Sequence, residues 1–246
     1  MEGFRPLKNT PPDSFIGKSI FFGRMLADFQ ILTIYRDLKK NVKNFRGSVL
    51  DVGCGQSPYR HLIEKYASNY TGIDIVDADK FDYNNSQIVP FNGEDIPFES
   101  ETFDSLICTE VLEHVFKHQK LVDEMFRVMR PGAFGFLTVP WSARFHYIPY
   151  DFFRYTPSSL KIIFSKFDEI QILNRGTDIP VIANKILIMW LRGFMPRKGI
   201  KFIFSPFWLL LFPFVGITLF IAHISILMNV GNSNDPLGYT IIFKKQ

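Results

Sequence analysis

Cysteine is scarce in this chain of 246 residues, which contains only Cys54 and Cys108. Two thiols cannot provide a disulfide framework for a chain of this length, and their separation is not the spacing of metal ligands. We therefore predict no metal site, and we expect a reducing compartment such as the cytoplasm.

The sequence also lacks a large excess of one charge. Its 28 Lys and Arg residues and 24 Asp and Glu residues give a net charge of only +4. The basic residues are scattered and form no stripe, which argues against nucleic acid as a partner. The first residues, MEGFRPLKNTPPDSF, are polar and rich in proline, without the apolar core of a signal peptide. These features predict that the folded part of the protein faces the cytoplasm.

Acidic and basic side chains are absent from residues 202–229, where His223 is the only titratable group. A transmembrane helix needs about 20 apolar residues, and this segment meets that length. However, Pro206 and Pro213 interrupt helical hydrogen bonding, and the following GYTIIFKK (238–245) has the pattern of a soluble strand. A bent or re-entrant helical hairpin that enters one leaflet satisfies both observations.

Three interpretations of this apolar region remain open. It docks on a membrane surface through residues 179–229, or it forms a soluble cap or dimer interface, or it spans the membrane and the terminal strand is misread. We predict the first, which places the protein on the cytoplasmic side of a membrane as a peripheral or monotopic protein. A soluble cytoplasmic protein is the alternative.

Apolar residues are abundant, at 47% of the sequence, which is enough for one well-filled domain with extra elements. Strand and helix patterns alternate from Val49 to about Val139, which predicts an α/β fold with helices on both faces of a mostly parallel sheet. Apolar spacing predicts helices over residues 16–42 and 110–129, and Thr156 with Pro157 begins another. The predicted strands are VLDV, NYTGIDI, QIVPF, FDSLICT, FGFLTVP, DEIQILNRG and GYTIIFKK.

Two glycines and an aspartate lie where the first predicted strand ends. VLDVGCG places Asp51, Gly53 and Gly55 at the carboxyl end of this strand, the edge where open α/β sheets bind ligands. Glycine lets a ligand approach the backbone, and the amphipathic helix predicted to follow would offer its N–H groups. The next strand closes on Asp74, a suitable acceptor for ribose hydroxyls.

A dinucleotide is one cofactor that binds at such a turn. A dinucleotide site requires a third glycine in the pattern G-x-G-x-x-G, and Pro58 occupies that position here. This substitution disfavours a dinucleotide. A structural turn without any ligand is the remaining alternative.

Five segments, in this order and at these intervals, resemble the class I S-adenosylmethionine-dependent methyltransferases, within them the group often called type 11. The resemblance covers roughly residues 47–167 and the terminal strand, and it implies a Rossmann-like sheet of seven strands and S-adenosyl-L-methionine as cofactor. The segments are VLDVGCG, YTGIDI, FNGEDIPFESETFDSLICTEVLEHV, EMFRVMRPGAFGFLTVPW and YDFFRYTPSSL.

Carried over by position, the resemblance implies a role for each of nine cofactor-binding residues. Related sequences usually carry Asp at position 92, and the amide oxygen of Asn92 can still accept from the adenine amino group. The residues are Asp51, Gly53 and Gly55 beside the methionine part, Asp74 at the ribose, Ile75 on the adenine, Asn92 and Gly93 at the adenine edge, and Thr109 and Glu110 closing the methionine side.

Methyl transfer to a hydroxyl or a carbon usually needs a base, whereas transfer to a carboxylate does not. His146 and His114 are the predicted catalytic bases, because one follows the fifth strand and the other the fourth. The alternative is that both histidines are structural. A dense polar and aromatic loop, RFHYIPYDFFRY, contains the residues predicted to bind the acceptor: Tyr150, Asp151, Arg154 and Tyr155. Asp151 and Arg154 could instead simply pair with each other.

The predicted division of the chain has four parts. Residues 1–46 form an N-terminal extension and helix, and residues 47–176 form the methyltransferase core. Residues 177–237 form an apolar helical insertion before the last strand, and residues 238–246 complete the core.

These motifs predict a methyltransferase that acts on an amphiphilic or lipid-linked small molecule, with O-methylation favoured. Two alternatives belong to other classes. One is an S-adenosylmethionine-binding pseudo-enzyme or scaffold with an interaction helix, and the other is a dinucleotide-dependent reductase, which Pro58 disfavours.

Overall fold

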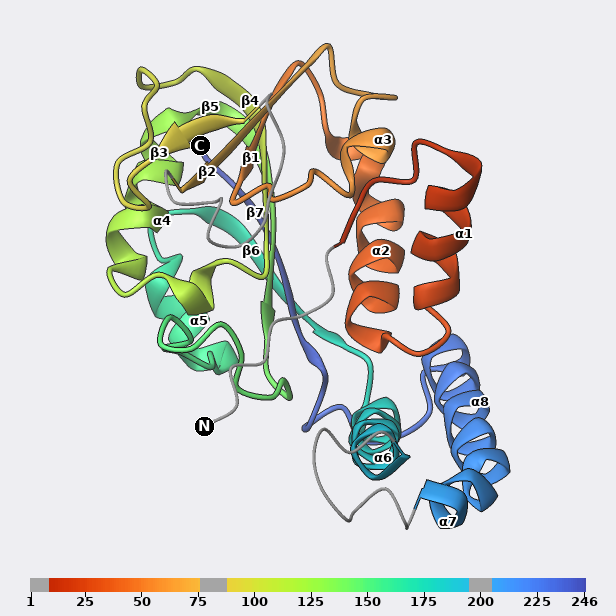
Figure 1. The fold of residues 1–246 in the computed structure, drawn as a ribbon. Coiled ribbons are helices and arrows are strands. Elements are labelled where there is room, and N and C mark those ends of the chain that lie inside the picture. The colour runs from red at the N-terminus through yellow and green to blue at the C-terminus, as the bar shows by residue number, and fades with distance from the viewer. Residues whose placement is uncertain (1–8, 76–87, 195–204) are drawn as a thin grey trace.

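A seven-stranded sheet forms the centre of the computed structural model, which describes residues 9–75, 88–194 and 205–246 (Figure 1). The strand order is β3-β2-β1-β4-β5-β7-β6, with β7 antiparallel to both of its neighbours and the other pairs parallel. This order confirms the predicted mostly parallel, Rossmann-like sheet. The strands are β1 (Ser48–Val52), β2 (Asn69–Ile75), β3 (Val89–Phe91), β4 (Phe103–Thr109), β5 (Met129–Pro140), β6 (Asp168–Arg175) and β7 (Gly238–Lys244).

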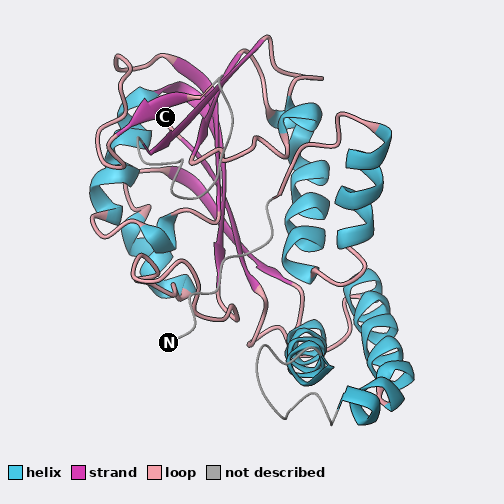
Figure 2. Cartoon of the chain, in the orientation of Figure 1, coloured by secondary structure: helices cyan, strands magenta, loops and turns pink. Residues whose placement is uncertain are grey.

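Helices cover both faces of this sheet (Figure 2). On one face Leu121, Met125 and Leu160 are fully buried, and on the other face Phe21 and Ile34 lie in a second apolar cluster. The amphipathic helix predicted after the first strand is only one turn long. The helices are α4 (His118–Val128) and α5 (Pro157–Ile163) on the first face, and α1 (Phe15–Arg24), α2 (Phe29–Asn41) and α3 (Arg60–Ile63) on the second.

The single helix predicted over residues 16–42 is wrong, because the chain forms two helices there. Asp28 causes the division, since its carboxylate accepts a hydrogen bond from the backbone N–H of Ile31 (3.2 Å) and so begins α2. The same carboxylate pairs with Arg24 at the end of α1 (2.9 Å). The turn between the helices allows Met25 and Phe29 both to be buried.

The helix predicted over residues 110–129 is also wrong at its start, because α4 begins only at His118. The carbonyl oxygen of Leu112 accepts from the hydroxyl of Tyr155 (2.8 Å), and that of Glu113 accepts from the N–H of Phe152 (2.9 Å). Residues 112–114 form a 3₁₀ turn instead. These bonds tie the segment to the loop of residues 144–155, which we call the lid loop.

Three apolar helices connect β6 to β7, at the lower end of Figure 1. In the sheet register, Gly238 of β7 lies opposite Pro140 of β5 and Arg175 of β6. The connection therefore leaves and rejoins the sheet at the carboxyl end of the parallel strands, which is the ligand-binding edge of this type of sheet. The helices are α6 (Asp178–Phe194), α7 (Ser205–Leu210) and α8 (Phe212–Met228).

The inner face of α8 packs against the rest of the molecule. Val215, Ala222 and Ile226 are buried on this face. The Nε2 atom of His223 lies 3.0 Å from the carbonyl oxygen of Leu26, in the turn that follows α1. The only titratable residue of the apolar segment thus holds α8 against the N-terminal helices.

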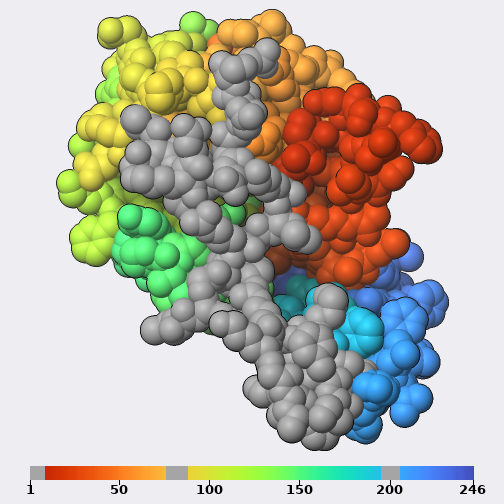
Figure 3. Space-filling view, viewed as in Figure 1, coloured from red at the N-terminus to blue at the C-terminus, as the bar shows by residue number. Residues whose placement is uncertain are grey.

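The outer face of α8 is exposed and apolar. On the neighbouring helix α1, Phe15, Ile16 and Ile20 are exposed as well, and Figure 3 shows α1 (red) and α8 (blue) on the same side of the molecule. No helix in the described part of the chain has both the length and the apolar character needed to cross a membrane. The exposed apolar residues of α8 are Phe212, Phe214, Ile217, Phe220, Ile221, Ile224, Leu227 and Met228.

α6 is partly buried. Ile182 and Met189 are exposed, whereas Ile179 packs in the cluster with α8. Trp190 is buried, and its indole N–H donates to the carbonyl oxygen of Trp208 (2.6 Å). Residues 195–204, which belong to the predicted membrane segment, lie outside the described residues.

Candidate active site

Two buried aspartates lie at the carboxyl ends of β1 and β2. The carboxylate of Asp74 accepts hydrogen bonds from the backbone N–H groups of Gly55 (2.7 Å) and Ile75 (2.8 Å). These donors fix the carboxylate but leave further lone pairs for a ligand. Asp51 lies on the neighbouring strand, where it pairs in register with Gly72. The two predicted acidic residues are therefore close together.

Asp51 has one carboxylate oxygen without a partner. Its Oδ2 accepts a hydrogen bond from the hydroxyl of Tyr70, whereas the buried Oδ1 has no hydrogen-bond partner among the described residues. Burial raises the pKa of Asp51 to about 7, the hydrogen bond from Tyr70 acts in the opposite direction, and the charge of Asp74 adds to the rise. A cationic donor would satisfy this atom, and the α-ammonium group of a methionine-like ligand is such a donor.

The turn after β1 requires its first glycine. Gly53 has a φ of +69°, and a Cβ atom there would lie 2.3 Å from Cγ2 of Val111. The backbone therefore approaches the segment after β4 more closely than a side chain would allow. Gly55 supplies the N–H group that holds Asp74. Both predicted glycines thus shape this edge of the sheet.

Glu110, which follows Thr109 at the end of β4, has a partner that the sequence analysis missed. Its Oε1 lies 2.6 Å from Nη2 of Arg175, a fully buried residue. The same nitrogen donates to the carbonyl oxygen of Val139 (3.0 Å). Arg175 ends a predicted strand at the ligand-binding edge, and this position is the signal that could have identified it.

The residues predicted for the adenine side lie together. Gly93 has a φ of +83°, and a Cβ atom there would lie 3.4 Å from Cγ2 of Ile75. The amide oxygen of Asn92 accepts from the N–H groups of Glu94 (2.8 Å) and Asp95 (2.7 Å), so it stabilises its own turn. Residues 76–87, which follow β2, lie outside the described residues.

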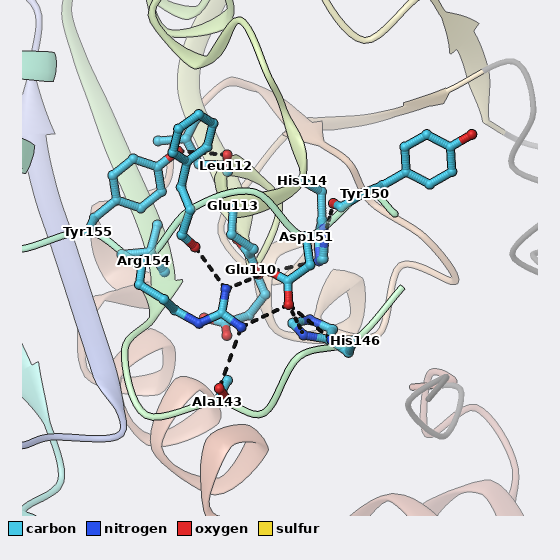
Figure 4. Close-up of polar contacts among 12 residues, drawn as sticks. Glu110, Leu112, Glu113, His114, Ala143, His146, Tyr150, Asp151, Arg154 and Tyr155 are labelled. Atoms are coloured by element: carbon cyan, nitrogen blue, oxygen red, sulfur yellow. Dashed lines mark hydrogen bonds and ion pairs between the residues drawn. The ribbon is translucent and has the colours of Figure 1, made fainter. Parts of the chain in front are cut away.

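Two histidines from distant segments meet beside this edge (Figure 4). The rings of His114 and His146 lie edge to face, with 4.8 Å between their centroids. Nδ1 of His114 is 2.7 Å from the carbonyl oxygen of Tyr150, and Nδ1 of His146 is 3.0 Å from Oδ2 of Asp151. A ring that donates from Nδ1 presents the lone pair of Nε2. The structure therefore brings both predicted bases together.

Burial lowers the pKa of His114 to about 4, although its hydrogen bond with Tyr150 acts in the opposite direction. The imidazole is therefore neutral near pH 7. A neutral imidazole can accept a hydrogen bond or a proton from an acceptor hydroxyl.

Asp151 and Arg154 pair with each other, as the alternative interpretation expected. Nη1 and Nη2 of Arg154 lie 2.5 Å and 2.9 Å from the two carboxylate oxygens. Burial opposes ionisation, but the hydrogen bond from Arg154 brings the pKa of Asp151 below its ordinary value. Tyr155 is buried, whereas Tyr150 exposes about half of its surface. Of these four predicted acceptor-binding residues, Tyr150 is therefore the most available to a ligand.

Glu113 lies next to the histidine pair. Both of its carboxylate oxygens are buried and have no hydrogen-bond partner among the described residues, and Oε1 lies 3.6 Å from Nε2 of His114. One ligand atom each from Glu113, His114 and His146 lies within 4.8 Å of the others, so these residues could hold a metal ion. Burial raises the pKa of Glu113 well above its ordinary value, which favours the neutral acid.

Comparison with known proteins identifies the domain that carries this edge. Residues 50–137 match the family model of a methyltransferase domain. A probable S-adenosylmethionine-dependent methyltransferase of Mycolicibacterium smegmatis is 29% identical over 96 residues, which are 37% of this chain and 37% of that protein. The ubiquinone biosynthesis O-methyltransferase of Coxiella burnetii is 29% identical over 93 residues, which are 35% of this chain and 40% of that protein. The chain thus spans less than half the length of these relatives.

Solved structures share the fold over most of the chain. A SAM-dependent methyltransferase from Archaeoglobus fulgidus superposes with a TM-score of 0.56 and 16% identity, over 93% of this chain and 99% of that chain. The [4+2]-cyclase SpnF superposes with a TM-score of 0.51 and 18% identity, over 88% of this chain and 81% of that chain. The family match assigns residues 50–137 to a methyltransferase domain, and the solved structures show that the sheet has the fold of S-adenosylmethionine-dependent methyltransferases.

Proposed function

We propose that this protein transfers a methyl group from S-adenosylmethionine to an oxygen of an amphiphilic or lipid-linked small molecule. The observation that carries the proposal is the placement of two functional clusters at one edge of the sheet. Asp51 and Asp74 lie at strand ends suited to the cofactor, and His114 and His146 lie beside the same edge. A bound cofactor would supply an activated methyl group on its sulfonium.

The residues at the strand ends suit the polar parts of that cofactor. Asp74 is oriented by two backbone N–H groups and can accept from ribose hydroxyls. The unpartnered Oδ1 of Asp51 can accept from the α-ammonium group of the methionine part. The other parts of the cofactor would lie beside Glu110 at the methionine part and beside Ile75 and Gly93 at the adenine.

His146 is the base in this proposal, because Asp151 orients it. Asp151 accepts from the backbone N–H of His146 (3.0 Å), its Oδ2 lies 3.0 Å from Nδ1, and Arg154 fixes Asp151 in turn. Nδ1 also lies 3.0 Å from the carbonyl oxygen of Arg144, to which it can donate. This arrangement leaves Nε2 of His146 to take the proton that leaves the acceptor hydroxyl. Nε2 of His114 would accept a hydrogen bond from the same hydroxyl and align it.

The amphiphilic character of the acceptor is supported by the position of the apolar helices. The connection through α6, α7 and α8 leaves the sheet at the edge that carries the two clusters. Curated relatives include the ubiquinone biosynthesis O-methyltransferase of Coxiella burnetii. We therefore propose that residues 177–237 act as a unit that brings an apolar acceptor to the core formed by residues 47–176 and 238–246, with residues 1–46 as an N-terminal extension.

We further propose that α8 and α1 dock on an anionic membrane surface. The eight exposed apolar side chains of α8 present roughly 900 Å² if a fully exposed large side chain presents about 200 Å², which exceeds the usual largest patch of a monomer. Neither helix contains an acidic residue, and Lys18 lies exposed on α1. Apolar side chains beside an exposed lysine, with no acidic residue among them, suit an anionic lipid interface.

Vesicle flotation tests this docking. The double variant Phe220→Ser/Leu227→Ser removes two outer side chains that make little contact with the core, so the fold should be retained. We expect the wild type to float with anionic vesicles and the variant to remain in solution. Ile162→Ser is the matched control, because Ile162 is equally exposed but lies on α5. A variant that floats like the wild type would refute docking, and a variant that loses only self-association would indicate a dimer interface.

Calorimetry and turnover test the proposed reaction. S-adenosylhomocysteine should bind the wild type, and Asp74→Ala should abolish this binding; tighter binding of NADH would overturn the cofactor assignment. His146→Gln should lose turnover with unchanged affinity for S-adenosylhomocysteine. Turnover that survives in both His146→Gln and His114→Gln would show that the histidine pair is not the catalytic base.

A further inference from the structure

A cavity of about 290 Å³, open to solvent, is lined by residues of the lid loop and of α6. Its lining consists of Arg144 from the lid loop and Lys185, Ile188, Met189 and Arg192 from α6. Three of these five side chains are cationic and none is acidic. The volume lies just below the range of about 300–1,000 Å³ that encloses a whole small ligand, so the cavity suits one part of a larger molecule.

The arrangement of α6 explains this charge. Lys185 and Arg192 are seven residues apart, which places them on one face of the helix with Ile188 and Met189 between them. Asp178 is the acidic residue of α6, but it lies in the first turn and accepts from the backbone N–H of Asn232 (2.9 Å). Within the part of the chain that the structure describes, neither Lys185 nor Arg192 has an ion-pair partner.

One lining residue of the cavity, Arg144, belongs to the loop that carries His146. Arg144 is two residues before His146, and its carbonyl oxygen lies 3.0 Å from Nδ1 of that histidine. The guanidinium of Arg154 also reaches this carbonyl oxygen (3.5 Å). A ligand held beside Arg144 is therefore held by the same loop that fixes the proposed base.

The helix that lines the cavity also carries exposed apolar side chains. Ile188 and Met189 lie between the two cations, and Met189 and Ile182 are more than half exposed on α6. α6 itself packs on α8, because Val181 and Ala183 share a cluster with Ala222. A molecule with an anionic group and an apolar chain would match both parts of this surface.

We propose that this cavity binds the phosphate or diphosphate group of the methyl acceptor, which makes the acceptor a phosphate-bearing amphiphile. A carboxylate carries a single charge and pairs with one cation, whereas a phosphate or diphosphate carries more charge and can engage Arg144, Lys185 and Arg192 together. Ile188 and Met189 contact the start of the apolar chain. The assignment rests on the proposed methyltransferase function, because it names the substrate of that site.

Binding of two soluble probes tests the assignment, with inorganic pyrophosphate for the anionic group and geranyl diphosphate for the amphiphile. The variant Lys185→Gln/Arg192→Gln should bind pyrophosphate at least about 10-fold more weakly than the wild type, because charge-assisted hydrogen bonds are lost. Geranyl diphosphate should bind the wild type more tightly than pyrophosphate does. Lys39→Gln/Lys40→Gln is the matched control, since these lysines are in the last turn of α2, and it should bind as the wild type does.

The outcomes separate the possible sources of the phosphate. Equal pyrophosphate affinity in the wild type and the cavity variant would overturn the assignment. Displacement of pyrophosphate by vesicles of phosphatidylcholine and phosphatidylglycerol would show that the cavity holds a bilayer headgroup, which also overturns it. S-adenosylhomocysteine should bind the wild type and the cavity variant equally. A wild-type protein that does not bind S-adenosylhomocysteine would refute the proposed methyltransferase function, whatever the result for the cavity.

Discussion

Cofactor affinity should depend on pH through Asp51. Burial raises the pKa of this carboxyl to about 7 in the free protein, so it is mostly protonated below pH 7. An ammonium group at Oδ1 favours the ionised form, and binding at low pH must therefore release a proton. The affinity for S-adenosylhomocysteine should consequently rise with pH and level off above pH 7.

The size of this effect follows from the two pKa values. If the bound carboxyl returns to its ordinary pKa of about 4, affinity at pH 5 should be roughly 100-fold lower than at pH 8, and binding at pH 6 should release about 0.9 proton. Calorimetry between pH 5 and pH 8, in two buffers of different ionisation enthalpy, measures both quantities. Asp51→Asn should weaken binding at pH 8 and remove the proton release.

Asp51 should also affect the stability of the folded protein, and this effect depends on pH. A raised pKa means that neutral Asp51 contributes stability below about pH 4, and that this stability is lost as the pH rises through about 7. Asp51→Asn has no such loss and can still accept from Tyr70, so it should melt at a higher temperature than the wild type at pH 8. Equal affinity of the wild type at pH 5 and pH 8, or an unchanged pH profile in the variant, would refute the placement of Asp51 at the ligand.

Three further predictions concern individual contacts. Gly53→Ala should cost about 2 kcal/mol or more in urea unfolding, because the new Cβ would carry a positive φ and meet Val111; an unchanged midpoint would contradict this. Arg175→Met should cost roughly 3 kcal/mol, because it leaves its carboxylate partner unpaired, whereas Lys166→Met on the exposed surface should change stability by less than about 0.5 kcal/mol. EDTA should leave turnover unchanged, because a neutral Glu113 is a poor metal ligand; activity lost to EDTA and restored by a divalent cation would assign the histidine cluster to a metal.

Features that depend on neighbouring residues were predictable from the sequence. Thr156 and Pro157 begin α5 as expected, because a helix cap is formed within one turn. The nine residues predicted to bind the cofactor lie at or just after the carboxyl ends of strands, and strand patterns are local, so Asp51 and Asp74 could be placed at one edge. The α1–α2 boundary was missed because the apolar spacing continues through Asp28, and only the carboxylate contact with Ile31 divides the two helices.

Features that depend on contacts between residues far apart in the sequence could not be predicted from local patterns. The ion pair between Glu110 and Arg175 joins residues that are 65 positions apart. The start of α4 is displaced because Tyr155 engages the carbonyl oxygen of Leu112. The pairing of β7 with β5 and β6 determines at which edge of the sheet the apolar helices leave. The sequence of a single strand does not reveal how that strand pairs with its neighbours.

Transfer of label from methyl-tritiated S-adenosylmethionine to a lipid extract tests the proposed reaction itself. We expect label in the organic phase with the wild-type protein, and its loss in His146→Gln under conditions where the variant still binds S-adenosylhomocysteine. A wild-type protein that binds S-adenosylhomocysteine but transfers no label to the lipid extract or to its aqueous phase would refute the proposed methyl transfer.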